Sequence, residues 1–133
     1  MNKRLNQVKE YRTCVNNFHR FNIAILACFI LGFDNDTKQS FRETVNFVKE
    51  SKIDLVRYAA LTPFPGTNLY NDLDNQKRII DKNWDNYDFQ HVVFKPKNMT
   101  PEELLKGVYF CWKETYKFKE ILKRTFARKD YRF

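Results

Sequence analysis

The sequence predicts an α/β fold in which two buried parallel strands alternate with amphipathic helices. Two short apolar runs, residues 23–32 and 55–61, each follow a segment with helical periodicity. The connections between these segments are short, so the order helix–strand–helix–strand specifies parallel strands joined by a right-handed crossover. The chain of 133 residues is long enough for one domain, and its 43% hydrophobic content excludes wholesale disorder.

The first helix and strand are predicted from their periodicity. Residues 3–20 carry apolar side chains at helical spacing between charged ones, and Asn22 is a plausible left-handed stop. The following run, IAILACFILG at residues 23–32, is almost continuously apolar. Such a run is typical of a parallel strand that is buried on both faces.

A second helix and strand follow at once. Asp36 is expected to cap the helix, and Gln39 three residues later completes a capping-box pattern. The inner face of this helix, which should end near Ser51, is predicted to carry Phe41, Val45 and Val48. Residues 55–61 then form the second strand, which Arg57 makes less purely apolar.

The loop that ends the second strand is the predicted ligand loop. Its sequence LTPFPGT, residues 61–67, contains two prolines that cannot donate to a strand ladder. Pro65-Gly66 is the residue pair of a type II turn, and Thr67 can cap a new helix. A stiff loop at the carboxyl end of a buried strand is where α/β proteins bind ligands.

The second half of the chain is predicted to be mostly helical. Residues 91–95 are a short strand candidate that ends at Pro96. A further helix begins with Thr100 as N-cap, Pro101 in its first turn and Glu103 closing a capping box. Its predicted apolar face carries Leu104, Leu105, Val108, Tyr109, Trp112 and Tyr116. A basic helix is expected over residues 120–133.

The net charge of +8 belongs to the two ends of the chain. Residues 1–33 carry a net +4 and residues 104–133 a net +6, whereas residues 34–103 carry a net −2. Such basic ends are typical of solvated helix faces, so nucleic-acid binding is not the expected function. The longest apolar run, residues 21–33, is too short to span a bilayer. These features predict a soluble, cytoplasmic protein without a membrane partner.

Five stretches occur in a characteristic order: FILGFDNDT (29–37), LTPFPGT (61–67), WDNYD (84–88), QHVVFKP (90–96) and MTPEEL (99–104). Together they resemble the C-terminal part of radical S-adenosylmethionine (SAM) enzymes, in the group that often carries an N-terminal cobalamin-binding domain. The resemblance covers about residues 2–118. It implies a catalytic domain that is a partial TIM-like barrel of parallel strands.

On this resemblance, residues 1–74 are the last two strands of the barrel with their helices, and residues 75–133 are a C-terminal extension. Ile30 would lie against the adenine of SAM, and Gly32 would let the backbone approach the ligand closely. Thr62 and Pro63, after the last strand, would offer backbone groups to the same ring. Cys28 stands where the family pattern has a glycine.

The family's 4Fe-4S cluster needs three thiolates at Cys-x-x-x-Cys-x-x-Cys spacing, which is absent here. Cys14, Cys28 and Cys111 are too widely spaced for a cluster, a zinc site or a disulfide framework, and are expected to be buried free thiols. Cobalamin would be a further cofactor only in full-length relatives.

We therefore expect a C-terminal portion of a radical SAM enzyme that forms the adenine-side wall of the SAM site and is inactive alone. Its partner would be a missing N-terminal half or an adjacent gene product, and its substrate an unidentified small molecule. One alternative is a degenerate remnant without activity. Another is a small basic module that binds nucleic acid or other anions, for which binding should depend on salt.

Overall fold

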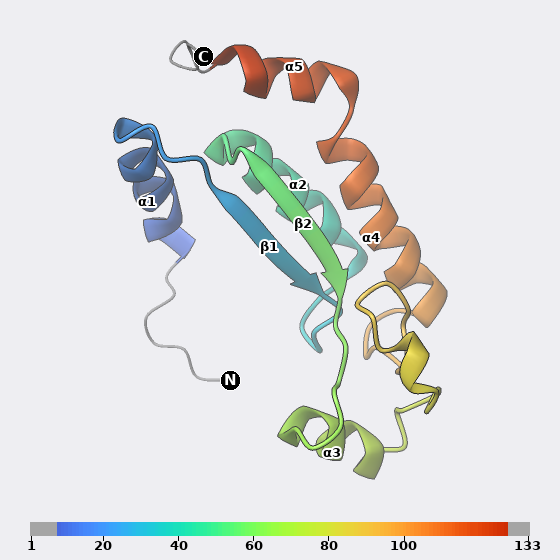
Figure 1. The fold of residues 1–133 in the computed structure, drawn as a ribbon. Coiled ribbons are helices and arrows are strands. Elements are labelled where there is room, and N and C mark those ends of the chain that lie inside the picture. The colour runs from blue at the N-terminus through green and yellow to red at the C-terminus, as the bar shows by residue number, and fades with distance from the viewer. Residues whose placement is uncertain (1–7, 128–133) are drawn as a thin grey trace.

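The computed structural model describes residues 8–127, which form two parallel strands and five α-helices. Figure 1 shows the strands side by side, with helix α2 (Lys38–Ser51) behind them and α4 (Pro101–Thr115) beside them. The other elements are α1 (Val8–Arg20), α3 (Asn68–Asn75), the short 3-10 turn η1 (Trp84–Asn86) and α5 (Phe118–Ala127). The predicted helical residues 3–7 and 128–133 lie outside the described part.

The two strands pair in parallel, as the sequence predicts. Strand β1 (Leu26–Leu31) and strand β2 (Leu55–Ala60) are in register from their first residues to their last. Leu61 N donates to Leu31 O at 2.8 Å, which extends the pairing one residue past β2. Helix α2 connects the two strands, so β1, α2 and β2 form one βαβ unit.

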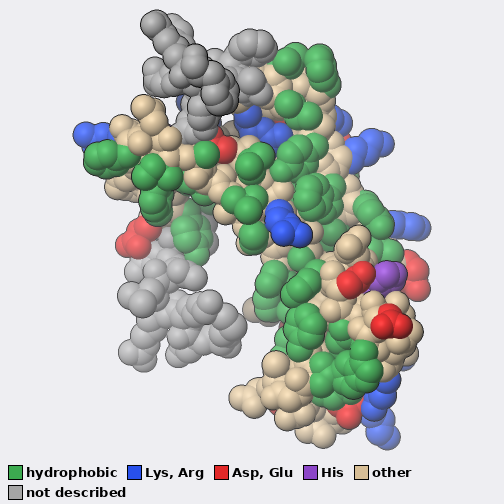
Figure 2. Space-filling view, viewed as in Figure 1, with side chains coloured by type: hydrophobic (Ala, Val, Ile, Leu, Met, Phe, Trp, Pro, Cys, Tyr) green, Lys and Arg blue, Asp and Glu red, His purple; other side chains and the backbone are tan. Residues whose placement is uncertain are grey.

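Among the described residues, helices cover only one face of this sheet. Val56 and Tyr58 point toward α4 and are 1% and 5% exposed. Leu26, Ile30 and Leu55 lie on the opposite face and are 45–54% exposed. The prediction that both strands are buried on both faces is therefore wrong, because α2 and α4 supply one layer and no described element supplies the second. Arg57 is also exposed on this face, and Figure 2 shows mostly hydrophobic side chains here with basic ones among them.

The core lies between the covered sheet face and helices α2 and α4. The predicted inner face of α2, Phe41, Val45 and Val48, is at most 5% exposed. From α4, Leu104 and Cys111 are fully buried against it. Tyr109, also predicted in the core, is 61% exposed, which is a correction to the predicted face of α4.

The helix caps confirm two predictions and correct a third. Thr67 caps α3, and Thr100 caps α4 in a capping box with Glu103. The N-cap of α2 is Thr37, with Ser40 completing the box, where the sequence predicted Asp36 and Gln39. Asp36 instead accepts hydrogen bonds from backbone amides just after β1.

Residues 91–95 do not form the predicted strand. Phe94 makes only an isolated antiparallel bridge with Ile79. Phe94 is nevertheless fully buried, so this segment is held by packing and by a few backbone bonds such as Lys95 N to Arg78 O at 2.8 Å. The extension is attached to the rest of the fold mainly through α4.

We expect Gly107→Ala to destabilise the protein, because a Cβ at Gly107 would lie 2.2 Å from Cζ of the buried Phe41 ring. Alanine normally stabilises a helix relative to glycine by about 0.5–1 kcal/mol. Overpacking should outweigh this gain, so that the variant has a free energy of unfolding about 1–3 kcal/mol lower than the wild type in urea. Lys106→Ala, one residue earlier on the exposed side of α4, is the control. Stabilisation by Gly107→Ala would contradict the close packing of α2 on α4.

Candidate functional site

The candidate site lies where the carboxyl ends of β1 and β2 meet. The bond between Leu61 N and Leu31 O carries the pairing to the last strand residues. The loop of residues 32–37 after β1 and the loop of residues 61–67 after β2 therefore leave the sheet side by side. This is the edge at which parallel α/β sheets bind ligands.

The structure places the four predicted site residues at this edge, with different exposure. Ile30 lies on the open face and is 45% exposed, so its side chain is accessible to a flat ligand. Thr62 is 6% exposed, and its hydroxyl donates to the carbonyl oxygen of Ala60 at 3.2 Å. Pro63 is under 2% exposed. Thr62 and Pro63 are therefore almost inaccessible in this structure, backbone included, and the assignment of all four residues to SAM stays a prediction.

Gly32 is required here by both conformation and packing. Its φ is +109°, a region that side-chain-bearing residues rarely adopt. A Cβ on Gly32 would also lie 2.6 Å from Leu104 Cδ2 in α4. The glycine thus lets α4 pack against the end of β1, which is a structural reason for it in addition to the predicted approach to a ligand.

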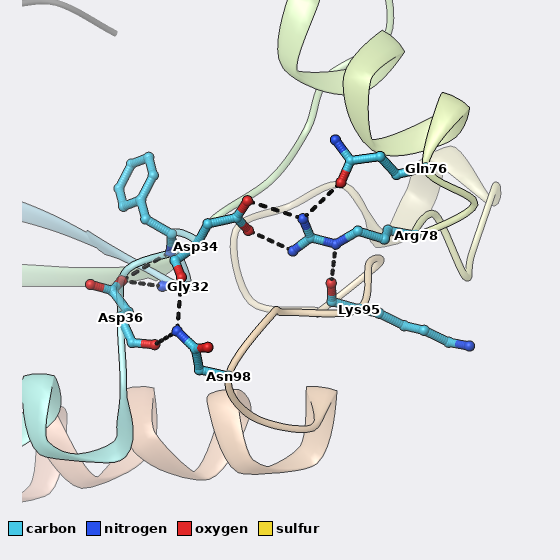
Figure 3. Close-up of polar contacts among 8 residues, drawn as sticks. Gly32, Asp34, Asp36, Gln76, Arg78, Lys95 and Asn98 are labelled. Carbon is cyan, nitrogen blue, oxygen red and sulfur yellow. Dashed lines mark hydrogen bonds and ion pairs between the residues drawn. The ribbon is translucent and has the colours of Figure 1, made fainter.

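A set of hydrogen bonds fixes the loop after β1. The Asp36 carboxylate accepts from Gly32 N at 2.8 Å and from Phe33 N at 2.9 Å. From the extension, the Asn98 side-chain amide donates to the carbonyl oxygens of Asp34 and Asp36 at 2.8 and 3.1 Å. Figure 3 shows these contacts around the loop. Asp36 therefore orders the strand end, which explains why it is not the helix cap.

Arg78 joins the same loop to the extension. Its guanidinium bonds the Asp34 carboxylate at 2.7 and 3.2 Å, and its Nε donates to the carbonyl oxygen of Lys95 at 2.8 Å (Figure 3). The hydrogen bond from Arg78 lowers the pKa of Asp34 below its usual value. The stability that this contact adds is present above the ordinary pKa of an aspartate and is lost as pH falls through the lowered value.

Two aromatic side chains stand beside the loop after β2. The Phe64 and Phe89 rings meet edge to face with centroids 5.2 Å apart, and the two residues are 40% and 43% exposed. Phe89 has a φ of +67°, which is unusual for a bulky residue. Its carbonyl oxygen accepts from Ala60 N at 2.9 Å, so this conformation is held by β2 itself.

The cysteines do not form a metal site in the part of the chain that the structure describes. Cys14 and Cys28 are exposed, which corrects the prediction of three buried thiols, and only Cys111 is buried. Burial raises the pKa of the Cys111 thiol to about 12, so it is not a thiolate at neutral pH. No group of three or more metal-ligating side chains occurs among residues 8–127. The residues present therefore do not fit an iron–sulfur cluster.

A basic cleft of about 490 Å³ lies away from this edge, near the starts of the strands. It is lined by Lys49, Lys52, Lys123 and Arg124 and also by Asp54 and Glu120. Lys49 and Lys52 lie at the C-terminal end of α2, where cations compensate the partial negative charge of the helix. His19, at the end of α1, contacts Asp54 at 2.9 Å. The basic side chains that line this cleft are therefore explained by the partial negative charge at the end of α2 and by ion pairs, and they do not require an anionic ligand.

Within residues 8–127, no helix has the length and apolar character needed to cross a membrane.

The sequence is similar to those of several known enzymes. No family model matches the chain. The chain is 39% identical, over 93% of its length, to bacteriochlorophyllide d C-12(1)-methyltransferase of Chlorobaculum tepidum, of which it covers 27%. It is 32% identical, over 86% of its length, to the anaerobic magnesium-protoporphyrin IX monomethyl ester cyclase of Cereibacter sphaeroides, of which it covers 18%.

A third relative is the tRNA-2-methylthio-N(6)-dimethylallyladenosine synthase of Buchnera aphidicola, at 33% identity over 58% of the chain. These relatives are radical SAM enzymes, and the matches fall in their C-terminal parts. The chain is thus homologous to the C-terminal part of radical SAM enzymes, and the resemblance in its motifs is confirmed. It spans about a quarter or less of the length of these relatives.

We expect Arg78→Lys to destabilise the protein, because lysine keeps the charge but cannot make the forked contacts to Asp34 and the carbonyl of Lys95. Loss of these charge-assisted bonds should lower the free energy of unfolding, measured in urea at neutral pH, by about 1–3 kcal/mol. Arg42→Lys on the exposed side of α2 is the matched control. Equal stability of the two variants would show that Arg78 does not hold the extension to the loop.

Proposed function

We propose that this chain forms the adenine-side wall of the SAM site of a radical SAM enzyme and is inactive alone. The observation that carries the proposal is the open sheet face, where Ile30 is accessible beside the fixed loops after β1 and β2. In this proposal residues 1–74 are the last two strands of a partial TIM-like barrel with their helices, and residues 75–133 are the C-terminal extension.

The chain's own residues supply binding and orientation. The Ile30 side chain offers an apolar surface for a flat ring, and the backbone of Thr62 and Pro63 lies at the same edge. Gly32, Asp36 and the extension hold the first loop in place before any ligand binds. The N-terminal part of the enzyme would supply the 4Fe-4S cluster and its electron.

The partner in this proposal is that N-terminal part, carried by an adjacent gene product or by a longer form of the protein. Apart from Arg57, the exposed side chains of the open face are apolar, as expected for the inner surface of a barrel whose other strands lie elsewhere. The relatives include a methyltransferase, a cyclase and a tRNA-modifying synthase, so they indicate no single substrate or reaction for this chain. Cobalamin, if it takes part, would also bind outside this chain.

The test is complementation with an N-terminal radical SAM part that carries the three-cysteine motif. After anaerobic reconstitution with iron and sulfide, we expect cluster absorbance and reductive SAM cleavage only when both parts are present. Ile30→Asp should abolish SAM cleavage, because a carboxylate would replace the apolar ring surface. Ile80→Asp is the matched control, since Ile80 is also 45% exposed but lies in the extension.

Two outcomes would contradict the proposal. Cluster formation by the chain alone would overturn the argument from its cysteines. SAM cleavage that withstands Ile30→Asp as well as it withstands Ile80→Asp would remove Ile30 from the site. If no N-terminal part restores cleavage, the chain is a remnant without activity.

A further inference from the structure

The edge of β2 that faces away from β1 is occupied by side chains where a third strand would pair. Backbone groups alternate along a strand, so Val56, Tyr58 and Ala60 direct theirs to this edge. Val56 N donates to the Tyr116 hydroxyl at 2.9 Å, and the same hydroxyl donates to Val56 O at 2.7 Å. One side-chain oxygen thus satisfies both backbone groups that a neighbouring strand would bind.

Two further contacts continue along the same edge. Trp112 Nε1 donates to the Tyr58 carbonyl oxygen at 3.2 Å, and Ala60 N donates to the carbonyl oxygen of Phe89 at 2.9 Å. Trp112 lies in α4, and Phe89 lies in the segment between η1 and α4. The extension therefore meets this edge from its first strand residues to its last.

Tyr116 is itself held in position by its neighbours. Its ring stacks on Trp112 with centroids 5.4 Å apart, and the Arg124 guanidinium lies 5.0 Å from the ring centroid. Arg124 is fixed in turn by a bond from Nη2 to the carbonyl oxygen of Thr115 at 2.6 Å. The hydroxyl is therefore presented to Val56 by a pre-formed cluster.

We propose that Tyr116 and Trp112, with the backbone of residue 89, seal β2 against the addition of another strand. An unsealed strand edge is a template for pairing with other chains. Sealing β2 makes it the last strand of the sheet, so that any further strand can join only at β1. The C-terminal extension thereby sets the direction in which the sheet can grow.

The edge of β1 differs from that of β2. Leu26, Cys28 and Ile30 direct their backbone groups away from β2, and no other described strand pairs with them. Beside β1, an apolar groove of about 610 Å³ runs between α1 and α2 and is lined by Tyr11, Val15, Phe18, Ala27, Phe29 and Phe47. Assigning this edge to the N-terminal part of the enzyme rests on the proposed function, whereas the seal on β2 does not.

Tyr116→Phe tests the seal, because it removes one oxygen and keeps the ring that stacks on Trp112. In the full chain we expect the Val56 amide to exchange its hydrogen roughly 10- to 100-fold faster, with the Val48 amide of α2 unchanged. The variant should also sediment with a weight-average mass up to about twofold higher than that of the wild type at the same concentration, because β2 then offers a second edge for pairing in addition to that of β1. Tyr109→Phe, an exposed tyrosine of the same helix, should match the wild type in both respects.

Unchanged exchange at Val56, or sedimentation equal to that of Tyr109→Phe, would overturn the proposal. Loss of protection at the Val48 amide as well would also overturn the proposal, because Tyr116 would then stabilise the whole core and not only cover the edge of β2. Neither readout involves SAM or a cluster. Tyr116→Phe should still complement the N-terminal part in SAM cleavage. The experiment therefore distinguishes failure of the proposal for the β2 edge from failure of the proposed function.

Discussion

The open apolar face of a two-stranded parallel sheet is the feature on which the rest of the structure depends. Parallel sheets are normally covered on both faces, because their strands carry apolar side chains on both sides. Here α2 and α4 cover one face, while Leu26, Ile30 and Leu55 remain exposed on the other. The sheet needs a second layer or further strands to cover this face, and the chain covers only 27% and 18% of two of its relatives.

The C-terminal extension stabilises two parts of this small sheet, the loop after β1 and the outer edge of β2. Arg78 and Asn98 hold the loop after β1, so the carboxyl edge is ordered before a ligand arrives. Trp112 and Tyr116 occupy the outer edge of β2. Both sets of contacts come from residues 75–133, which gives the extension a structural role that its sequence did not indicate.

Local signals in the sequence predicted local structure well. Pro65-Gly66 and Thr67 form the predicted turn and cap, because both depend only on neighbouring residues. Asp36 was assigned to the wrong role, since a carboxylate between a strand and a helix can serve the amides of either one. It binds Gly32 N and Phe33 N, and Thr37 caps the helix.

The contacts that order the candidate site could not be predicted from spacing. Arg78 and Asp34 are 44 residues apart, and Tyr116 and Val56 are 60 apart. No periodicity links such pairs, and only the folded chain brings them together. The exposure of Cys28 was mispredicted for a related reason: the apolar run indicates a buried strand, but the layer that would bury it is not among the described residues.

Amide hydrogen exchange at Cys28 and Ile30 tests the account most directly, because these residues direct their backbone groups to the open edge of β1. The measurement compares the chain alone with its mixture with an N-terminal radical SAM part. We expect rapid exchange at both amides in the chain alone and strong protection in the mixture, with the Val56 amide protected in both. Protection of Cys28 and Ile30 in the chain alone, or exchange that the N-terminal part leaves unchanged, would contradict it.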